Sequence, residues 1–595
     1  MLTGSLTDWQ QAYAHGADPE HLLDTQRQAC LGDDPAWISV ASAEQLRQQL
    51  HALRTLEAEH GRAALPLYGV PFAVKDNIDV AGFTTTAACE AFAREASADA
   101  VAVQRLRRAG AIVLGKTNLD QFATGLVGTR SPYGVVPNTF DPARVSGGSS
   151  SGSASVVARG LVPFALSTDT AGSGRIPAGF NQIVGLKPTP GAVSGTGLVP
   201  ACRTLDCIGV LAQSVADSAR VLALMEGTDP ADVYGRPRPR LSPVPPLATL
   251  RVATPVQRPL APDYDTAFQA FEQALRPQVA QLQTLDFGPL FDVAALLYQG
   301  PWVAERVVAA DAIYRHQADQ MLPVIREVLD VAQRFSAADT FAAQYRLQAL
   351  QRQADALWQQ WDVLCVPTAP RHPRIDEVQA DPIAVNAELG LYTNFVNLLG
   401  WSAIAIPAAR LPDGLPFGIT LIAPGWREPQ LVAWAQQLEQ QVRLPAGTTG
   451  RLPKAEPLPQ WHVPAAGDSV RLAVVGAHLR GMPLNHELLA CGARFVQETQ
   501  SAPSYRLYAL PGTTPPKPGL ARAHSGQPIV LEVWDMPVDN LGAFVARVPA
   551  PLGIGNVELA SGEVVKGFIC EGHALEQALD VTAHGGWRAY CASLT

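Results

Sequence analysis

The sequence predicts an α/β fold over most of the chain, followed by a smaller α+β domain. Two continuous apolar runs of strand length, AIVLGKTN (111–118) and LVPFALSTD (161–169), alternate with helical segments such as AVAVQRLRRAG (100–110). A proline-rich stretch without a hydrophobic period then precedes a further set of strand-like runs. We therefore expect one domain at 1–443, a linker at 444–467 and a second domain at 468–595.

The other elements follow from hydrophobic spacing. The segment ASAEQLRQQLHALRTLEAEHG (41–61) has the spacing of an amphipathic surface helix, and residues 262–361, rich in Ala, Gln and Leu, predict a helical insertion. Strand-like runs resume at VLCVPTAP (363–370) and GITLIAPG (418–425). The second domain has such runs at SVRLAVVG (469–476), YRLYAL (505–510), QPIVLEVWDM (527–536) and VVKGFICE (564–571). They predict an α+β domain or a small β barrel.

Composition limits the classes of partner. The 595 residues carry a formal net charge of −9 and 17% charged residues, which argues against a nucleic-acid or membrane partner and favours a small-molecule substrate. Eight scattered cysteines form no C-x-x-C pair, so we expect reduced thiols, no metal and no cofactor. The first residues lack the pattern of a leader, and no window approaches 18 uninterrupted apolar residues. We therefore expect a cytoplasmic protein.

Two short motifs match known patterns but lack the surrounding structure that those patterns need. GAIVLGKT (110–117) fits the phosphate-loop expression, yet the residues inside it are the strand itself. We interpret Gly115 and Lys116 as strand-end residues beside the active cleft. GSSSG (148–152) fits a nucleophile elbow at Ser150, but the preceding FDPARVSG is no buried strand and no histidine lies nearby in the sequence. Neither motif predicts the function.

A third constellation combines two glycine-flanked serines with a lysine. Ser173 lies in DTAGSGR (169–175) and Ser149 in SGGSSSGSA (146–154), while no histidine occurs between His60 and His316. A serine hydroxyl needs a base, and a lysine can serve when burial lowers its pKa far below the usual value of about 10.4. Lys75, at the end of the apolar run in GVPFAVKDNIDV (69–80), suits that role.

With LGKTNLDQFATG (114–125) between them, these three stretches resemble the amidase signature family over roughly residues 60–440. The resemblance implies the family's fold, a mixed central sheet wrapped by helices. It also implies a Ser-(cis-Ser)-Lys triad, in which Ser173 is the acylated nucleophile, Ser149 the bridging hydroxyl on a cis peptide and Lys75 the neutral base. Glycines 147, 148 and 152 would allow the close packing there.

The loop at 169–175 also suits the stabilisation of a tetrahedral oxyanion. Its small side chains let a substrate approach the main chain, and the candidate donors are the N–H groups of Thr170, Ala171, Gly172 and Ser173. Asp169 and Arg175 flank the loop with opposite charges. We expect them to hold it by charge-assisted hydrogen bonds and to take no part in the chemistry.

The segment LLYQGPWVAERVVAADAIY (296–314) bears on which amide is cleaved. Pro301, after Gly300, is typical of the first turn of a helix, which leaves Tyr298 at the entry and Arg306 on the second turn. Helical side chains lean toward the N-terminus, so we expect the Arg306 guanidinium to reach the Tyr298 phenol. Arginine is suited to bidentate binding of a carboxylate.

This segment, DTAGSGR and KDNIDVAGFTTTAACEAF (75–92) resemble the allophanate hydrolase branch of the family. The resemblance implies hydrolysis of urea-1-carboxylate to ammonia and N-carboxycarbamate, leading to carbon dioxide and further ammonia, by a homodimer. AHLRGMPLNHEL (477–488) resembles the start of that branch's second domain, which is similar in fold to γ-glutamyl cyclotransferase. In some relatives that domain decomposes N-carboxycarbamate, and in others it serves assembly. His486 is the candidate for a second site.

Alternatives remain open from the sequence. Within the same chemistry, the substrate is another small carboxylated or neutral amide, or the chain is an amidotransferase-type subunit that releases ammonia from glutamine. From other classes, the chain is a nucleotide-binding regulator through GAIVLGKT, or its C-terminal part is solely a dimerisation module.

Overall fold

The computed structural model describes residues 2–239, 244–459, 461 and 469–594. The chain divides into two compact units, Met1–His462 and Val463–Thr595, and each is described by itself. The first unit is built around one large sheet, and the second contains smaller sheets of its own.

The large sheet of the first unit has eleven strands in the order β1-β5-β2-β6-β8-β7-β12-β13-β11-β9-β10. In that order the strands are Trp37–Val40, Ile112–Thr117, Pro71–Lys75, Phe164–Asp169, Cys207–Ala212, Val184–Lys187, Ser402–Arg410, Pro416–Ala423, Val363–Pro367, Arg251–Pro255 and Gln281–Leu285. A separate pair is formed by β3 (Thr84–Thr85) and β4 (Arg94–Glu95). The sheet is mixed, because β5, β2 and β6 are parallel neighbours while β6 pairs antiparallel with β8.

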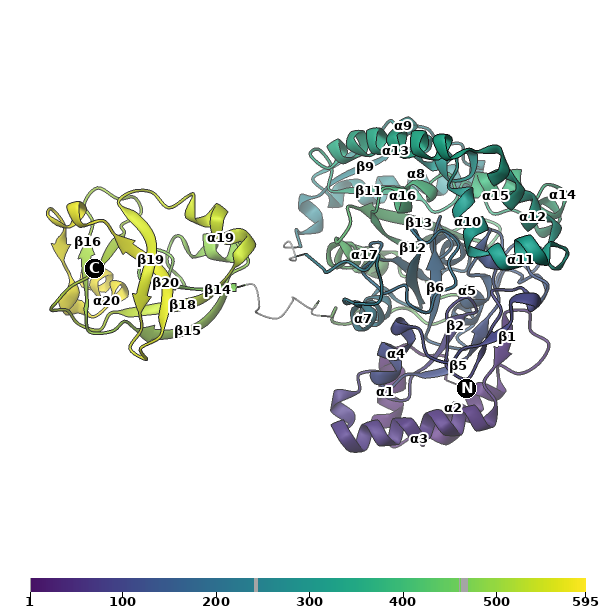
Figure 1. Cartoon of the computed structure of the whole chain (residues 1–595), viewed down its shortest axis with the longest axis horizontal. Helices are drawn as coiled ribbons and strands as arrows, with labels where there is room; N and C mark the ends of the chain where they lie inside the picture. Colours follow the sequence, from purple (N-terminus) through teal and green to yellow (C-terminus); the bar gives the residue numbers. More distant parts are fainter. Residues whose placement is uncertain (1, 240–243, 460, 462–468, 595) are drawn as a thin grey trace. The chain divides into compact units, whose positions relative to one another are not determined.

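Helices surround this sheet, as the sequence predicts. Figure 1 shows α1, α2 and α3 at one end of the unit and α9 and α13 at the other. The helices α1 to α9 are Leu6–Ala14, Pro19–Gln28, Ala43–His60, Val101–Arg108, Ser151–Ala158, Arg175–Phe180, Val215–Met225, Pro262–Leu275 and Gly288–Gln299. The helices α10 to α17 are Val303–Ala309, Asp311–His316, Pro323–Asp330, Ala337–Leu357, Ile375–Ala380, Ala384–Leu389, Asn394–Leu398 and Glu428–Val442.

Local sequence explains the ends of the predicted surface helix, α3. The Ser42 hydroxyl accepts the N–H of Gln45 at 3.1 Å, and the Gln45 side chain accepts the N–H of Ser42 at 2.7 Å, which together form a capping box. Gly61 ends the helix with φ +76°, a conformation that glycine adopts without strain. The leucines of α3 face the core.

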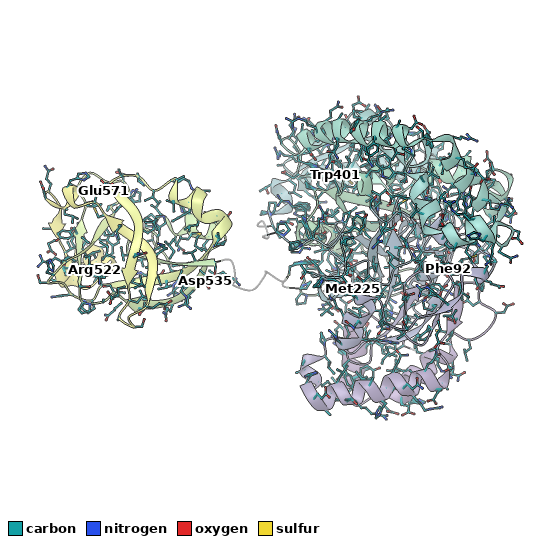
Figure 2. The ribbon with its side chains drawn as sticks, viewed as in Figure 1. Phe92, Met225, Trp401, Arg522, Asp535 and Glu571 are labelled. Atoms are coloured by element: carbon teal, nitrogen blue, oxygen red, sulfur yellow. The ribbon has the colours of Figure 1, made fainter. Side chains whose placement is uncertain are left out.

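The predicted helical insertion is wrong in one place. Within 262–361 the chain forms β10, which pairs in parallel with β9 at the edge of the large sheet. Only Leu282 of β10 is fully buried, so this edge strand needs few apolar residues. The other elements there are helical, and Trp358, at the end of α13, packs edge-to-face on Trp401 at 4.7 Å between ring centroids. Trp401 is labelled in Figure 2.

The first part of the predicted linker contacts the first unit closely. Arg451 and Lys454 form ion pairs with Asp8 of α1 at 2.9 and 3.0 Å, and Glu456 pairs with Arg220 of α7 at 2.6 Å. Residues 460 and 462–468 of that predicted linker lie outside the described residues. From 444 to 459 the chain therefore belongs to the first unit by its contacts.

The second unit combines a five-stranded sheet with a three-stranded one. The larger sheet has the order β15 (Arg494–Gln500), β18 (Val530–Pro537), β14 (Ser469–Val474), β20 (Val564–Cys570) and β19 (Leu552–Glu558). The smaller has the order β17 (Pro518–Arg522), β16 (Tyr505–Ala509) and β21 (Leu579–Asp580). Its helices are α18 (Asn485–Ala490), α19 (Val538–Val545) and α20 (Trp587–Ala592). All four predicted strand runs form strands, and the similarity to γ-glutamyl cyclotransferase stays a prediction.

Candidate active site

Lys75 lies at the carboxyl end of β2, in the interior of the first unit. Because β2 and β6 are parallel neighbours, the end of β2 meets the end of β6, where the loop with Ser173 begins. The Lys75 amine is 2.6 Å from the Thr168 hydroxyl and 2.7 Å from the Ser149 hydroxyl. Lys75 is fully buried, and this burial lowers its pKa to about 7 although nearby carboxylates, Asp120 first, oppose the change. The amine is therefore poised to act as a base near neutral pH.

Ser149 lies just before α5, and the peptide bond between Gly148 and Ser149 is cis. The space around this turn leaves no room for side chains at the neighbouring glycines. A Cβ at Gly148 would lie 2.2 Å from an Asp120 carboxylate oxygen, and one at Gly152 would lie 2.2 Å from the Ala36 carbonyl oxygen. The glycine-rich sequence thus brings Ser149 against Lys75.

Ser173 lies in the loop between β6 and α6, and only 1% of it is exposed. Its carbonyl accepts the N–H of Ser150 at 3.2 Å, which fastens it beside the Ser149 turn. Its hydroxyl donates to the Gly125 carbonyl at 3.4 Å, and within the described residues it makes no hydrogen bond to the Ser149 hydroxyl. The structure therefore brings Lys75 and Ser149 into contact and places Ser173 next to them with its hydroxyl turned to Gly125.

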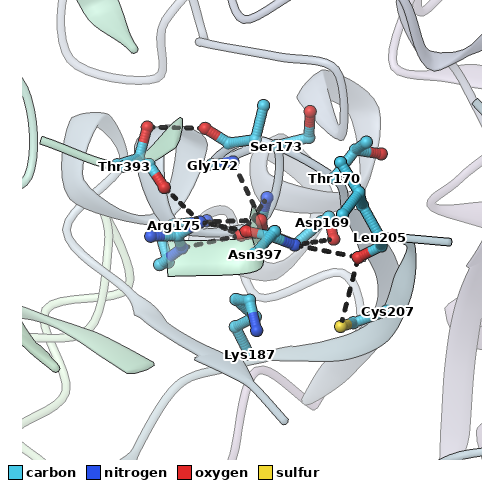
Figure 3. Close-up of polar contacts among 12 residues, drawn as sticks. Asp169, Thr170, Gly172, Ser173, Arg175, Lys187, Leu205, Cys207, Thr393 and Asn397 are labelled. Atoms are coloured by element: carbon cyan, nitrogen blue, oxygen red, sulfur yellow. Dashed lines mark hydrogen bonds and ion pairs between the residues drawn. The ribbon is translucent and has the colours of Figure 1, made fainter. Parts of the chain in front are cut away.

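A buried ion pair holds the loop that carries Ser173. The Arg175 guanidinium donates twice to the Asp169 carboxylate, at 2.9 Å each. Burial opposes the Asp169 charge, but Arg175 outweighs it and lowers the pKa of Asp169 to about 2. Figure 3 shows Arg175 and Asn397 converging on Asp169, and the Thr393 hydroxyl donates to the Ala171 carbonyl at 2.6 Å. The expected structural role of Asp169 and Arg175 matches these contacts.

The four predicted oxyanion donors divide into two groups. The N–H of Gly172 donates to the Asp169 carboxylate at 2.8 Å, so it is occupied and does not point at a substrate. The N–H groups of Thr170, Ala171 and Ser173 have no acceptor among the described residues. The Gly172 prediction is corrected, because the carboxylate that closes the loop takes that donor. Three neighbouring N–H groups remain for a developing oxyanion.

Arg306 and Tyr298 meet as the sequence predicts. The Arg306 Nη2 lies 3.2 Å from the Tyr298 hydroxyl, and the guanidinium lies over the ring, 5.2 Å from its centroid. The helix boundaries differ from the prediction: Tyr298 is on the last turn of α9, residues 300–302 form a turn, and α10 begins at Val303. Arg306 is 2% exposed, and its Nε has no hydrogen-bond partner among the described residues.

One short segment contacts both the predicted carboxylate-binding arginine and the predicted nucleophile. Arg306 Nη1 donates to the Thr124 hydroxyl at 3.0 Å and to the Ala123 carbonyl at 3.4 Å. The next residue, Gly125, accepts the Ser173 hydroxyl. A buried guanidinium and the candidate nucleophile thus contact the same three-residue segment, 123–125, although they lie 133 positions apart in the sequence.

Two further buried polar contacts are not predicted by any sequence motif. The Thr170 hydroxyl donates to the Asp206 carboxylate, and burial raises the pKa of Asp206 to about 6. Lys116 forms an ion pair with Asp76 at 3.1 Å, and both side chains are fully buried. Lys116 lies within β5, so GAIVLGKT is a strand and not a phosphate loop.

The second unit contains a cavity of about 120 Å³ that His486 does not line. His486 is exposed, and its Nδ1 lies 2.9 Å from the Pro483 carbonyl. His478 lines the cavity instead, 3.1 Å from the Glu487 carboxylate and stacked on Phe568 at 5.0 Å between ring centroids. Lys517 and Arg547 also line it. The geometry therefore favours His478 over His486 as the histidine of a second site.

Within the described part of the chain, no cluster of three or more His, Cys, Asp or Glu side chains is arranged to hold a metal ion. A search of the same residues finds no helix with the length and apolarity needed to span a membrane. No histidine of the described residues hydrogen-bonds to Lys75, Ser149 or Ser173.

Comparison with known proteins finds a matching family model for each of the two units. The Amidase family model matches residues 27–432, and the model of the allophanate hydrolase C-terminal domain matches residues 470–592. Urea amidolyase of Lachancea kluyveri is 43% identical over 612 residues, covering 99% of this chain and 33% of that protein. The chain thus spans about a third of the length of the urea amidolyase relatives it matches.

Two further matches differ in coverage. The structure of Kluyveromyces lactis allophanate hydrolase matches with a TM-score of 0.82 at 40% identity over 100% of both chains. A glutamyl-tRNA(Gln) amidotransferase component from Symbiobacterium thermophilum is 36% identical over 411 residues, covering 62% of this chain and 83% of that protein. The match to the amidotransferase is therefore partial, whereas the match to the hydrolase covers both units. The chain belongs to the amidase signature family and carries the C-terminal domain of allophanate hydrolases.

Proposed function

We propose that the first unit hydrolyses allophanate, urea-1-carboxylate, to ammonia and N-carboxycarbamate. The observation that carries this proposal is the segment 123–125, which contacts both Arg306 and Ser173. A guanidinium binds a carboxylate in bidentate geometry, so a small amide with a carboxylate can be held with its carbonyl beside Ser173. The similarity to allophanate hydrolase and urea amidolyase, each over nearly the whole of this chain, supports the same substrate.

In the proposed reaction Ser173 attacks the terminal carbonyl carbon while its proton passes through the Ser149 hydroxyl to the neutral amine of Lys75. The 2.7 Å contact between Lys75 and Ser149 supports the second transfer, and the first requires the Ser173 hydroxyl to turn from Gly125 toward Ser149. The free N–H groups of the 170–173 loop stabilise the oxyanion. Lys75 then returns the proton to the leaving nitrogen, ammonia departs, and water cleaves the acyl-enzyme through the same groups.

For the second unit we propose a role in decomposing N-carboxycarbamate. Breaking one C–N bond releases carbon dioxide, leaves the electron pair on nitrogen and requires a proton there. The cationic side chains of Lys517 and Arg547, which line the cavity, suit the binding of a dianion. His478 lines the same cavity and is our candidate for the group that delivers that proton. The alternative is a second unit that serves assembly only, with His486 and His478 both without effect on turnover.

We also propose that the protein is a cytoplasmic homodimer. Its eight cysteines are all free thiols, which supports a reducing compartment.

Three large apolar side chains on α10 and α13 are exposed: Val308 at 76%, Phe341 at 56% and Tyr345 at 71%. They support a self-association surface. If so, Phe341→Ser with Tyr345→Ser should lower the mass measured by light scattering from dimer to monomer, and an unchanged mass would place the contact elsewhere.

The test of the substrate is ammonia release from allophanate, malonamate, glutamine and a neutral fatty amide, measured side by side. We expect allophanate and malonamate to be the best substrates, and Arg306→Gln to lower kcat/KM for both by about 100-fold, since hydrogen bonds to charged groups contribute about 1.5–3 kcal/mol. The neutral amide should change by less than twofold. Arg315→Gln, which removes an exposed arginine paired with Asp311, is the matched control.

Other outcomes of this assay support the alternatives. Preference for glutamine would indicate an amidotransferase-type component, as the partial similarity to the Symbiobacterium thermophilum protein suggests. Preference for the neutral amide would indicate an amidase in which Arg306 is structural.

A further inference from the structure

The loop at 201–206, which we name the bridge loop, is tied to the candidate oxyanion loop. The Asp206 carboxylate accepts the Thr170 hydroxyl and also the N–H of Ala201 at 2.7 Å, so it closes its own loop while it holds the neighbouring one. Asn397 links the same two loops, because its Nδ2 donates to the carbonyls of Asp169 at 2.7 Å and Leu205 at 3.1 Å. Figure 3 shows the Asn397 side chain between Asp169 and Leu205.

The other side of the bridge loop is tied to α10, the helix that carries Arg306. The Glu305 carboxylate accepts the Thr204 N–H at 3.0 Å and the Thr204 hydroxyl at 2.5 Å. The Cys202 thiol lies 3.8 Å from the Trp302 carbonyl, in the turn just before α10. Glu305 directly precedes Arg306 in the chain, so the bridge loop contacts the residue next to the one that carries the guanidinium.

We propose that the bridge loop sets the separation between the Arg306 guanidinium and the Ser173 hydroxyl, and so selects amides with a single atom between the carboxylate and the amide carbonyl. Thr204 and Glu305 are positioning residues in this scheme, because they touch neither substrate nor reacting atoms. The proposal rests on the function proposed above and adds the structural origin of its selectivity for substrate length.

The sensitivity of catalysis to distance makes this selection effective. One extra methylene lengthens a substrate by one C–C bond of about 1.5 Å. A displacement of about 1 Å from the productive geometry costs about 10²-fold in rate. Malonamate has one carbon between its carboxylate and its amide carbonyl, as allophanate has one nitrogen, whereas succinamate has two carbons. A rigid link between α10 and the 170–173 loop therefore favours malonamate over succinamate.

The test is the ratio of kcat/KM for malonamate to that for succinamate, with propionamide as the neutral reference. We expect Glu305→Gln to lower the ratio at least fivefold, mainly through malonamate, and to leave kcat/KM for propionamide within twofold. Thr204→Val should act in the same direction. The double variant should be no worse than the stronger single one, because both remove the same contact. Asp311→Asn, which breaks the neighbouring exposed pair with Arg315, is the matched control.

The outcomes separate this proposal from the function on which it rests. If the wild-type protein does not prefer malonamate to propionamide, the proposed function fails. If it does, and Glu305→Gln and Thr204→Val both keep the malonamate-to-succinamate ratio within twofold of wild type, the bridge loop does not set the separation. Each variant counts as folded if its thermal unfolding midpoint stays within a few degrees of the wild-type value. If Glu305→Gln is unstable, Thr204→Val, which is the smaller change in structure, provides the test.

Discussion

The titratable groups of the two candidate sites differ in their exposure to solvent and in what shifts their pKa values. In the candidate site of the first unit, Lys75 and the groups it touches are completely enclosed, and desolvation outweighs the surrounding carboxylates to bring the pKa of the amine to about 7. In the cavity of the second unit, the side chain of His478 is 15% exposed and that of its partner Glu487 is 33% exposed. Burial lowers the pKa of His478 there, but the Glu487 carboxylate acts against it.

The two environments suit different chemistry. A dry site without a contacting counter-ion keeps a lysine amine neutral near pH 7, so that it is able to accept a proton. A site open to water and lined by Lys517 and Arg547 is suited to hold an anion and exchange protons. Substitutions in each unit, together with changes of pH, can therefore separate the roles of the two sites.

Removing the nucleophile should abolish the chemistry of the first unit. Ser173→Ala should lower ammonia release from allophanate by roughly 10⁴-fold or more, because triad members act as a unit. Lys75→Ala should approach the same loss at pH 7, and Ser149→Ala should retain more activity. Ser150→Ala is the matched control, since Ser150 donates to the Thr168 carbonyl at 3.2 Å and has no proposed role. If Ser150→Ala lost as much activity as Ser173→Ala, the interpretation of GSSSG as a nucleophile elbow, with Ser150 as the nucleophile, would be supported instead.

The second unit should affect only the later step. We expect His478→Asn to slow carbon dioxide release after allophanate hydrolysis by about 100-fold, the lower end of the usual contribution of general acid catalysis. The first ammonia should appear at the wild-type rate. His486→Asn should change neither, because its ring lies away from the cavity. Stopped-flow detection of carbon dioxide checks both, and an effect confined to His486→Asn would restore the sequence-based assignment.

The enclosure of Lys75 should appear in the pH profile. Because the amine must be neutral, kcat should rise with pH and level off above about 7, falling about tenfold for each unit below. Thr168→Val removes an acceptor that favours the charged form, so the midpoint should move to lower pH. Profiles of kcat for both proteins provide the check. A midpoint near pH 10 in the wild type would show that Lys75 is not the base.

The buried carboxyl groups of Asp217 and Glu439, which have no proposed catalytic role, should affect only the pH dependence of folding stability. Burial raises the pKa of Asp217 to about 7 and that of Glu439 to about 8. Groups whose pKa is raised by folding contribute stability below their unfolded pKa, near 4, and that contribution is lost as the pH rises through the folded value. The thermal midpoint should therefore fall between pH 5 and 7. Asp217→Asn with Glu439→Gln should remove most of this slope, which for two such groups is on the order of 3 kcal/mol per pH unit. An unchanged slope would assign it to other groups.

The sequence indicated the candidate site residues, whose catalytic roles stay predictions, but not the residues that hold them in place. Lys75, Ser149 and Ser173 stand in local patterns of glycine, serine and an apolar run, and the lean of helical side chains predicted that Arg306 meets Tyr298. Asp206 could not be found this way, because its contact with Thr170 joins positions 36 apart that no local pattern relates. The prediction for Gly172 differs from the structure because the Asp169 carboxylate accepts the Gly172 N–H, and the sequence does not indicate which N–H of the loop that carboxylate takes.

For two differences between prediction and structure, strand β10 and the position of His486, the sequence itself holds relevant information. QLQTL, the strand β10, lies at a sheet edge with one buried side chain, so its glutamines resembled those of the surrounding helices. In NHELLA, the helix α18, His486 is two positions before the buried Leu488 and therefore lies on the opposite face. His478 precedes that helix, and helical periodicity does not restrict it.

The contacts of Arg451, Lys454, Glu456 and Trp461 have a consequence for any attempt to separate the two units. Shortening the chain after 443 would leave Asp8 of α1 and Arg220 of α7 without their partners Arg451, Lys454 and Glu456. It would also uncover the Arg238 guanidinium, which lies 5.1 Å from the centroid of the buried Trp461 ring. A truncation at 461 keeps these contacts. Any loss of activity in that shortened chain would then report on the missing second unit and not on the disruption of α1 or α7.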